Sequence, residues 1–290
     1  MRRLDLFRFL YTVLGSQRPV LWSSDPVTAP QTYLRPLAWL LPVIATGCRS
    51  GAHATTESVE LTVFAASSLT EVLGAIETDF ERAHPQVDVQ TVFAGSQVLR
   101  LQIQHGAAAD VLLPADPSYV EDLSRRGLVT TSRTVAHNEL VLAVSPRSAP
   151  DLRRFGDLER AERIVLGSRD VPVGAYAETI LSAAAARYGA AFVNRVRQRV
   201  VSREHNTRLV RAKVEMGEAD AAIIYRTDVL ASDRLKLVPI PPELNLATSY
   251  PVAVLSDAPH PDDAATFAAF LETPAAAITW QRYGFTPEVP

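Results

Sequence analysis

The sequence predicts an α/β protein of two lobes with a ligand cleft between them. Three strand–helix units follow one another between residues 61 and 127, which is typical of a parallel sheet. A second block of the same kind runs from residue 163 to residue 225. Two late strands and two terminal helices come after it, and we expect them to rejoin the first lobe. The expected lobes are therefore 59–139 with 246–290, and 140–245.

The first block alternates short apolar runs with segments of helical periodicity. The runs read as buried strands at 61–66, 87–93 and 110–114. The helices begin near Ser68, Ser96 and Asp116, which are residue types that favour the N-cap position. An apolar strand at 139–144 then leads into the second block.

The second block repeats the alternation, and glycines close its helices. Its strands are expected at 163–166, 199–202 and 219–225, and its helices at 171–188 and 206–216. The late elements are strands at 235–240 and 250–255 and helices at 262–271 and 274–283. Because the chain crosses between lobes near 138–144 and 240–250, we expect hinges there. A cleft at the carboxyl ends of the strands is a natural ligand site.

The composition is that of a globular protein, with 47% apolar and 21% charged residues. The net charge of −3 provides no broad positive field, which argues against a nucleic-acid partner. No pair of histidines has the spacing of metal ligands.

The single cysteine, Cys48, ends a short apolar run that follows Arg35. A basic residue, an apolar stretch and small residues describe a secretory signal, and the run is too short to span a bilayer. Ala45-Thr-Gly-Cys48 resembles a bacterial lipobox, with Ala45 in place of the usual Leu. We expect a signal peptide over 35–48, lipidation of Cys48 and a location in the periplasm or cell envelope. An ordinary signal peptide is the alternative.

The segments on either side of this signal are expected to lie outside the folded part. Residues 1–34 precede the signal and are not expected in the mature protein. The small polar residues of 49–58 suit a linker between the anchor and the first lobe.

Polar or flexible residues stand at five places where a strand ends or a helix starts. The N–H groups at a helix start lack partners and, with the helix dipole, attract anions. Gly95 and Gly174 would let the backbone come close to a ligand. Each place alone could be only a helix cap. The five places are Ser67-Ser68, Gly95-Ser96, Pro172-Val173-Gly174, Asn206-Thr207 and Tyr225.

A site that offers hydrogen-bond donors and no carboxylate suits a fully ionised oxyanion such as molybdate, tungstate or sulfate. A carboxylate would instead favour a protonated anion such as phosphate, which can donate a hydrogen bond. A dianion can be held by neutral donors when their dipoles are already aimed at it and water is excluded.

Seven motifs follow one another over residues 59–286: Phe64-Ala-Ala-Ser-Ser-Leu-Thr70, Phe93-Ala-Gly-Ser-Gln97, Gly106-Ala-Ala-Ala-Asp-Val111 with Ala115-Asp116, Val171-Pro-Val-Gly-Ala-Tyr-Ala177, Gly217-Glu-Ala-Asp-Ala-Ala-Ile-Ile-Tyr225, Tyr250-Pro-Val-Ala-Val254 and Arg282-Tyr-Gly-Phe285. In kind and order they resemble the periplasmic molybdate-binding proteins of ABC transporters. The resemblance implies the two-lobed type II fold of periplasmic binding proteins.

The same resemblance implies the site. Two serine hydroxyls, backbone N–H groups and one tyrosine hydroxyl would hold the anion. Ser68 and Ser96 match the serines, and Tyr225 matches the tyrosine. Val173 and Thr207, where the family usually has Ala and Val, would act through their N–H groups. The metal of molybdate would be held only through its oxygens, and no cofactor is implied.

The implied function is capture of molybdate or tungstate by a monomer that delivers it to the membrane permease of an ABC importer. Membrane contact would otherwise come only from the lipid anchor. The alternatives are a binding protein for another oxyanion such as sulfate, and a serine hydrolase. The sequence has no Gly-x-Ser-x-Gly elbow, and nothing pairs His137 or His205 with a serine, so we do not expect an enzyme.

Overall fold

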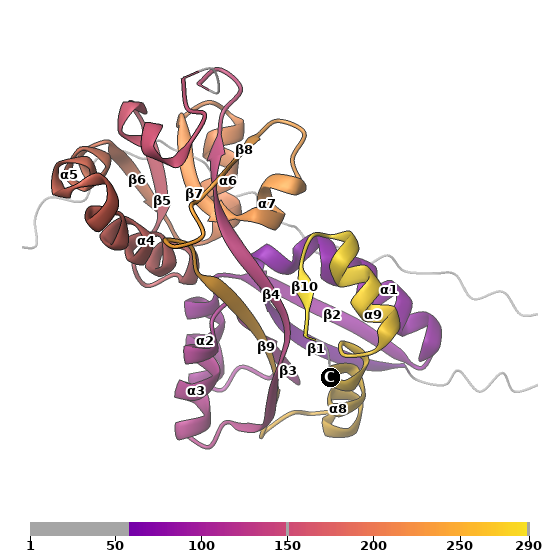
Figure 1. Ribbon diagram of the computed structural model, residues 1–290. Helices are drawn as coiled ribbons and strands as arrows, with labels where there is room; N and C mark the ends of the chain where they lie inside the picture. Colours follow the sequence, from indigo (N-terminus) through magenta and orange to yellow (C-terminus); the bar gives the residue numbers. More distant parts are fainter. Residues whose placement is uncertain (1–57, 149–150, 289–290) are drawn as a thin grey trace, which may run out of the picture. The chain divides into compact units, whose positions relative to one another are not determined.

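The computed structural model describes residues 58–148 and 151–288 (Figure 1). The expected signal peptide and Cys48 lie outside the described residues, as does the linker except for Ser58. Within the described part, no helix is both long enough and apolar enough to cross a membrane.

The first lobe is built on a mixed sheet. Strands β1, β2 and β3 are parallel, as predicted, whereas β9 runs antiparallel to β3 and to β4. The short strand β10 pairs with the other side of β4. The bounds are β1 (Val59–Ala66), β2 (Val87–Ala94), β3 (Val111–Leu113), β4 (Val129–Val144), β9 (Ala247–Leu255) and β10 (Thr286–Pro287).

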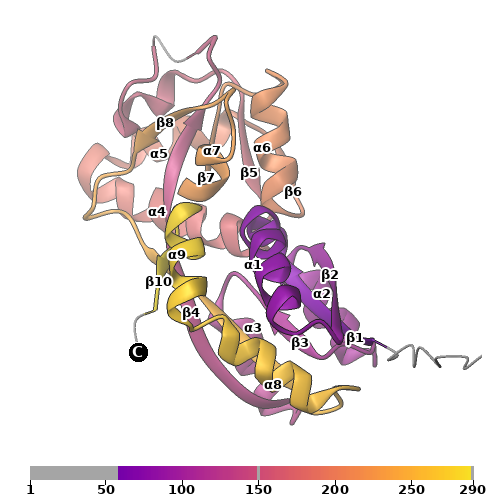
Figure 2. The ribbon, with the colours of Figure 1, turned by 90° about the vertical axis from the view of Figure 1, so that its right-hand side faces the viewer.

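Helices cover both faces of this sheet, because successive strand residues point to opposite faces. Val63 and Ala65 of β1 pack in one apolar cluster with α1, α8 and α9, whereas Phe64 packs in another with α2 and α3. Figures 1 and 2 show these two helical layers. The bounds are α1 (Thr70–Ala83), α2 (Ser96–Gln104), α3 (Pro117–Arg125), α8 (Pro261–Phe270) and α9 (Pro274–Arg282).

The second lobe repeats the α/β pattern. Strand β5 pairs in parallel with β6 and β7, and β8 pairs with β4. Two helices were not predicted from the sequence. Helix α5 starts directly after Gly189, and α7 is too short to show periodicity. The bounds are β5 (Ile164–Gly167), α4 (Pro172–Tyr188), α5 (Ala190–Gln198), β6 (Val200–Glu204), α6 (Thr207–Glu215), β7 (Ala221–Tyr225), α7 (Arg226–Leu230) and β8 (Lys236–Pro239).

Strand β4 belongs to both lobes. Up to Glu139 it pairs with β9, and from Leu140 it pairs with β7. It spans 16 residues, where the sequence analysis expected only its last part. The expected run at 139–144 is apolar because it is buried among strands of the second lobe, whereas the preceding half is largely exposed and polar.

The helix starts differ from the prediction at one functional residue. Ser68 does not cap α1. It lies inside a single 3-10 turn, Ser67–Leu69, and the N-cap of α1 is Leu69. Asp116 does cap α3, since its carboxylate accepts a hydrogen bond from the Ser118 N–H at 2.8 Å. The consequence is that the Ser68 hydroxyl is available for a tertiary contact.

Candidate functional site

A small cavity lies between the two lobes. Its lining includes all five residues selected from the sequence: Ser68, Ser96, Val173, Thr207 and Tyr225. All five are buried. The cavity volume is only about 10 Å³, which leaves room for about one water molecule. The cavity therefore suits a compact inorganic ligand rather than a sugar or a peptide.

Three helices begin at this cavity. Ser96 is the first residue of α2, Pro172 and Val173 open α4, and Thr207 opens α6. Each start presents N–H groups that lack a partner inside the helix, together with the positive end of the helix dipole. Among the described residues that line the cavity, none carries a charge. The arrangement favours an anion held by neutral donors.

The Ser96 hydroxyl is oriented as a donor. Its oxygen accepts a hydrogen bond from the N–H of Ala115 at 3.1 Å. Because the oxygen already accepts this bond, the hydroxyl proton points elsewhere. Ser96 lines the cavity, so the proton can point into it. Ser96 can thus donate one hydrogen bond to a ligand.

The Ser68 hydroxyl stands at the end of a hydrogen-bonded chain. Its oxygen is 3.1 Å from the Tyr250 hydroxyl, which in turn lies 3.5 Å from the Asn138 amide nitrogen. The Asn138 amide is fixed, because its oxygen accepts from the Glu139 N–H and its nitrogen donates to Thr227. If Asn138 donates to Tyr250 and Tyr250 donates to Ser68, the Ser68 proton is free for the cavity. Sequence reasoning missed Asn138 and the role of Tyr250, since neither stands at a helix start.

Tyr225 presents the most telling group of the site. It ends β7 with 1% of its surface exposed, and its hydroxyl has no hydrogen-bond partner of normal geometry in the described chain. The neighbouring Tyr250 ring packs edge-on against it, with the two ring centroids 6.0 Å apart. Burial keeps the pKa of Tyr225 well above its ordinary value, so the hydroxyl retains its proton. A buried donor without a partner costs free energy, and a ligand in the cavity would remove that cost.

Thr207 acts differently from the serines. Its hydroxyl donates to a buried carboxylate, Asp228 Oδ2, at 2.7 Å. In this arrangement only its backbone N–H is left for the cavity. Asp228 lies in α7, three residues beyond Tyr225, and the sequence analysis did not select it. A single acidic residue in a short helix carries no sequence signal of its own.

The two site glycines are required by close backbone neighbours. A side chain at Gly95 would place its Cβ 2.5 Å from the carbonyl oxygen of His205, and one at Gly174 would place its Cβ 2.0 Å from that of Ser168. Gly95 thereby admits a backbone segment of the second lobe. The expected approach of a ligand to these two glycines stays a prediction.

Several side chains join the lobes around the cavity. The Gln97 amide donates to the His205 carbonyl at 2.9 Å, and the Tyr119 hydroxyl donates to the Asp170 carbonyl at 2.7 Å. On α1, Glu71 pairs with Arg208 of α6 at 2.6 Å. These contacts link the two lobes beside the cavity.

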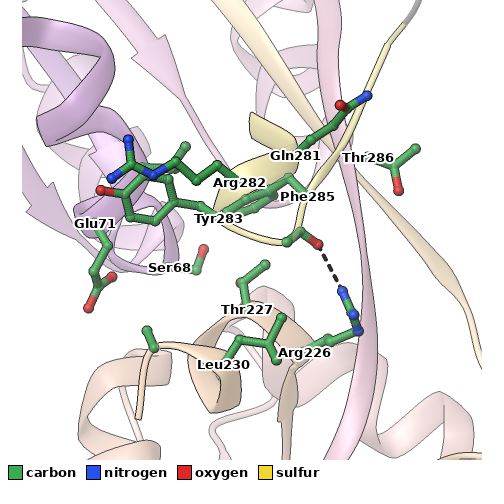
Figure 3. Close-up of a pocket in the computed structure, with 13 residues that line it drawn as sticks. Ser68, Glu71, Arg226, Thr227, Leu230, Gln281, Arg282, Tyr283, Phe285 and Thr286 are labelled. Atoms are coloured by element: carbon green, nitrogen blue, oxygen red, sulfur yellow. Dashed lines mark hydrogen bonds between the residues drawn. The ribbon is translucent and has the colours of Figure 1, made fainter. Parts of the chain in front are cut away.

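A larger groove of about 590 Å³ borders the same region and shares only Ser68 among the five selected residues (Figure 3). Arg226 crosses one side of it and donates to the Gly284 carbonyl at 3.2 Å. Charges of both signs, Glu71 and Arg282, line it. The groove lacks the converging helix starts, so the small cavity is the better candidate for a binding site.

Comparison with known proteins places the chain. The family model of bacterial extracellular solute-binding proteins matches residues 61–286. The chain is 29% identical over 252 residues to YvgL of Bacillus subtilis, named as an ABC transporter substrate-binding lipoprotein, and the match covers 85% of this chain and 94% of that protein. It is 30% identical over 238 residues to the molybdate-binding protein ModA of Haemophilus influenzae, and the match covers 79% of this chain and 91% of that protein.

A solved structure supports the fold. The sulfate-binding protein SubI of Mycobacterium tuberculosis matches with a TM-score of 0.70 at 21% identity, covering 80% of this chain and 88% of that one. The described part of the chain contains no cluster of three or more His, Cys, Asp or Glu that could hold a metal ion directly. The likeness to this structure shows that the chain has the two-lobed type II fold of periplasmic binding proteins, and the cavity lies between its lobes.

Proposed function

The chain belongs to the bacterial extracellular solute-binding protein family, and we propose that its cavity captures molybdate or tungstate for an ABC importer. The observation that carries the proposal is the Tyr225 hydroxyl, buried and unpartnered in a cavity where three helices begin. Such a site supplies donors only, and a fully ionised oxyanion supplies acceptors only.

Each selected residue has a role in this proposal. Ser68, Ser96 and Tyr225 donate from their hydroxyls, whereas Val173 and Thr207 donate from the backbone N–H. The oxygens of the anion receive all of these bonds, so the metal itself meets no protein ligand. The similarity to ModA favours molybdate, although the residues of the cavity suit tungstate equally well.

Sulfate is the second candidate. It is also a dianion that only accepts hydrogen bonds, and the fold is shared with a protein named for sulfate. Phosphate is disfavoured, because the described lining offers no carboxylate to accept its remaining proton.

Calorimetric titration of residues 52–290 with molybdate, tungstate, sulfate and phosphate tests the proposal. We expect molybdate and tungstate to bind more tightly than sulfate, and phosphate to bind most weakly. Molybdate should also raise the melting temperature by mass action. Equal affinity for sulfate would keep the fold and the site but replace the substrate.

The proposal includes the molecule's surroundings. The protein acts as a monomer, meets the permease of the importer, and is held at the membrane through Cys48, which the similarity to a lipoprotein supports. The lobes 59–139 with 246–290 and 140–245 open and close by bending of the two connections near 138–144 and 240–250. Small-angle scattering with and without molybdate would show the closure as a smaller radius of gyration.

A further inference from the structure

A buried carboxyl group lies directly behind the cavity. Asp228 is 2% exposed, and its Oδ1 atom has no hydrogen-bond partner among the residues that the structure describes. Its Oδ2 atom accepts the Thr207 hydroxyl proton at 2.7 Å. Asp228 does not line the cavity, but Thr207 does. The carboxyl therefore reaches the site only through Thr207.

The surroundings of Asp228 do not neutralise it fully. Arg208 and Arg211 approach from α6, but both pair with Glu71 of α1, at 2.6 and 3.3 Å. Burial raises the pKa of Asp228 to about 7, and Glu71 opposes the two arginines. The groups that face Asp228 are thus Arg208 and Arg211 of α6, Glu71 of α1, Tyr225 of β7 and Tyr250 of β9.

Among the described residues, the other strands that pack against α7 place no unpaired charged group near the Asp228 carboxyl. Strand β4 carries Glu139, which pairs at 3.5 Å with Arg226, the first residue of α7. Strand β8 carries Lys236, which is exposed. The charge on Asp228 is therefore governed by α6, by α1 and by whatever occupies the cavity.

We propose that Asp228 is a positioning residue of the oxyanion site, and that it takes up a proton when the anion binds by reversing its hydrogen bond with Thr207. The inference rests on the proposed function. In the ionised state Thr207 donates to Asp228, so its hydroxyl has no proton to offer a ligand.

A proton from solvent on Oδ2 turns the same contact around. Asp228 then donates to the Thr207 oxygen, and the Thr207 proton is released to point into the cavity. The Oδ1 atom becomes a neutral carbonyl oxygen, which costs less to leave unpartnered than a carboxylate oxygen. The net change is one proton taken from solvent for each anion bound, with no other group altered.

Electrostatics gives the direction of the coupling. A dianion in the cavity and a carboxylate behind it repel each other in a medium of low dielectric constant. Anion binding therefore raises the pKa of Asp228. By linkage, protonation of Asp228 tightens anion binding by the same factor.

Titration calorimetry with molybdate between pH 6.5 and 8.5 tests the inference. Buffers of different ionisation enthalpy report the number of protons taken up per anion. We expect uptake of roughly half a proton per anion between pH 7 and 8, and the dissociation constant to rise on the order of tenfold across the range. The Asp228→Asn variant mimics the protonated form, because its amide can donate to Thr207. It should bind tightly at every pH without uptake.

Asp233→Asn is the matched control, since it removes one exposed carboxylate from the same lobe. It should keep the proton uptake of the parent protein. Thr207→Val provides a second readout if the Asn variant does not fold. The Thr207 hydroxyl lowers the pKa of Asp228, so its loss should move the uptake to higher pH.

Molybdate binding without proton uptake, or uptake that survives Asp228→Asn, would overturn this inference and leave the proposed function standing. Failure of molybdate, tungstate and sulfate to bind at any pH would overturn both.

Discussion

The Tyr225→Phe variant makes the sharpest prediction, because it deletes one hydroxyl and keeps the ring. The ring is buried and packs edge-on against Tyr250 at 6.0 Å, a contact that phenylalanine preserves. In the ligand-bound protein the hydroxyl should donate to an anionic oxygen. A hydrogen bond to a charged group contributes about 1.5–3 kcal/mol. The variant should therefore bind molybdate roughly tenfold to a hundredfold more weakly.

The same substitution should act in the opposite direction on the ligand-free protein. The hydroxyl is buried without a partner, and such a group costs about 1–3 kcal/mol. Removing it should raise the melting temperature of the ligand-free protein by a few degrees, since each kcal/mol shifts a chain of this size by roughly 2–4 °C. Loss of affinity together with a gain in stability identifies a ligand-binding group rather than a structural one.

Tyr250→Phe is the matched control. Its hydroxyl is hydrogen-bonded to Ser68 at 3.1 Å, so its removal should lower the melting temperature of the ligand-free protein. Calorimetric titration and thermal unfolding of both variants give the full comparison. Unchanged molybdate affinity in Tyr225→Phe would show that this hydroxyl does not contact the anion, and the reasoning about the site would fail.

Four further predictions concern other residues of the chain. Ser68→Ala and Ser96→Ala should each weaken molybdate binding roughly tenfold to a hundredfold. Ser96→Ala should also lower the melting temperature, because the buried N–H of Ala115 loses its acceptor. If calorimetric titration finds unchanged molybdate affinity for one of these variants, that serine does not bind the anion. Glu71→Gln breaks the pairs between α1 and α6, so scattering should show a larger radius without ligand, and an identical radius would assign closure to other contacts. Because burial raises the pKa of Asp228 to about 7, its ionisation destabilises the fold as pH rises from about 4 to 7. Asp228→Asn should therefore raise the free energy of unfolding by up to about 4 kcal/mol at pH 8 and by almost nothing at pH 4. Denaturant unfolding at both pH values measures this difference. Cys48→Ser should release the protein from the membrane fraction of a bacterium that exports it, and equal partitioning would remove the lipid anchor.

The sequence predicted the strand–helix order, and the five residues selected from it are all among those that line the cavity. Helical periodicity and N-cap residues are local signals, and Asp116 illustrates how well they transfer. Ser68 shows their limit, because a 3-10 turn precedes α1 and moves the cap away from it. Nothing local could have revealed that Ser96 accepts from Ala115, that Ser68 meets Tyr250, or that Thr207 is bound to Asp228. Those contacts join residues that lie 19 to 182 positions apart in the chain.

The place of β9 in the first sheet has a consequence for how the protein is made. This strand is inserted between β3 and β4, although it is synthesised after the whole second lobe. Until residue 255 has left the ribosome, β3 and β4 lack the neighbour that joins them, and α8 and α9 are still missing from the core. The nascent chain thus cannot complete its first lobe until β9, α8 and α9 have been synthesised.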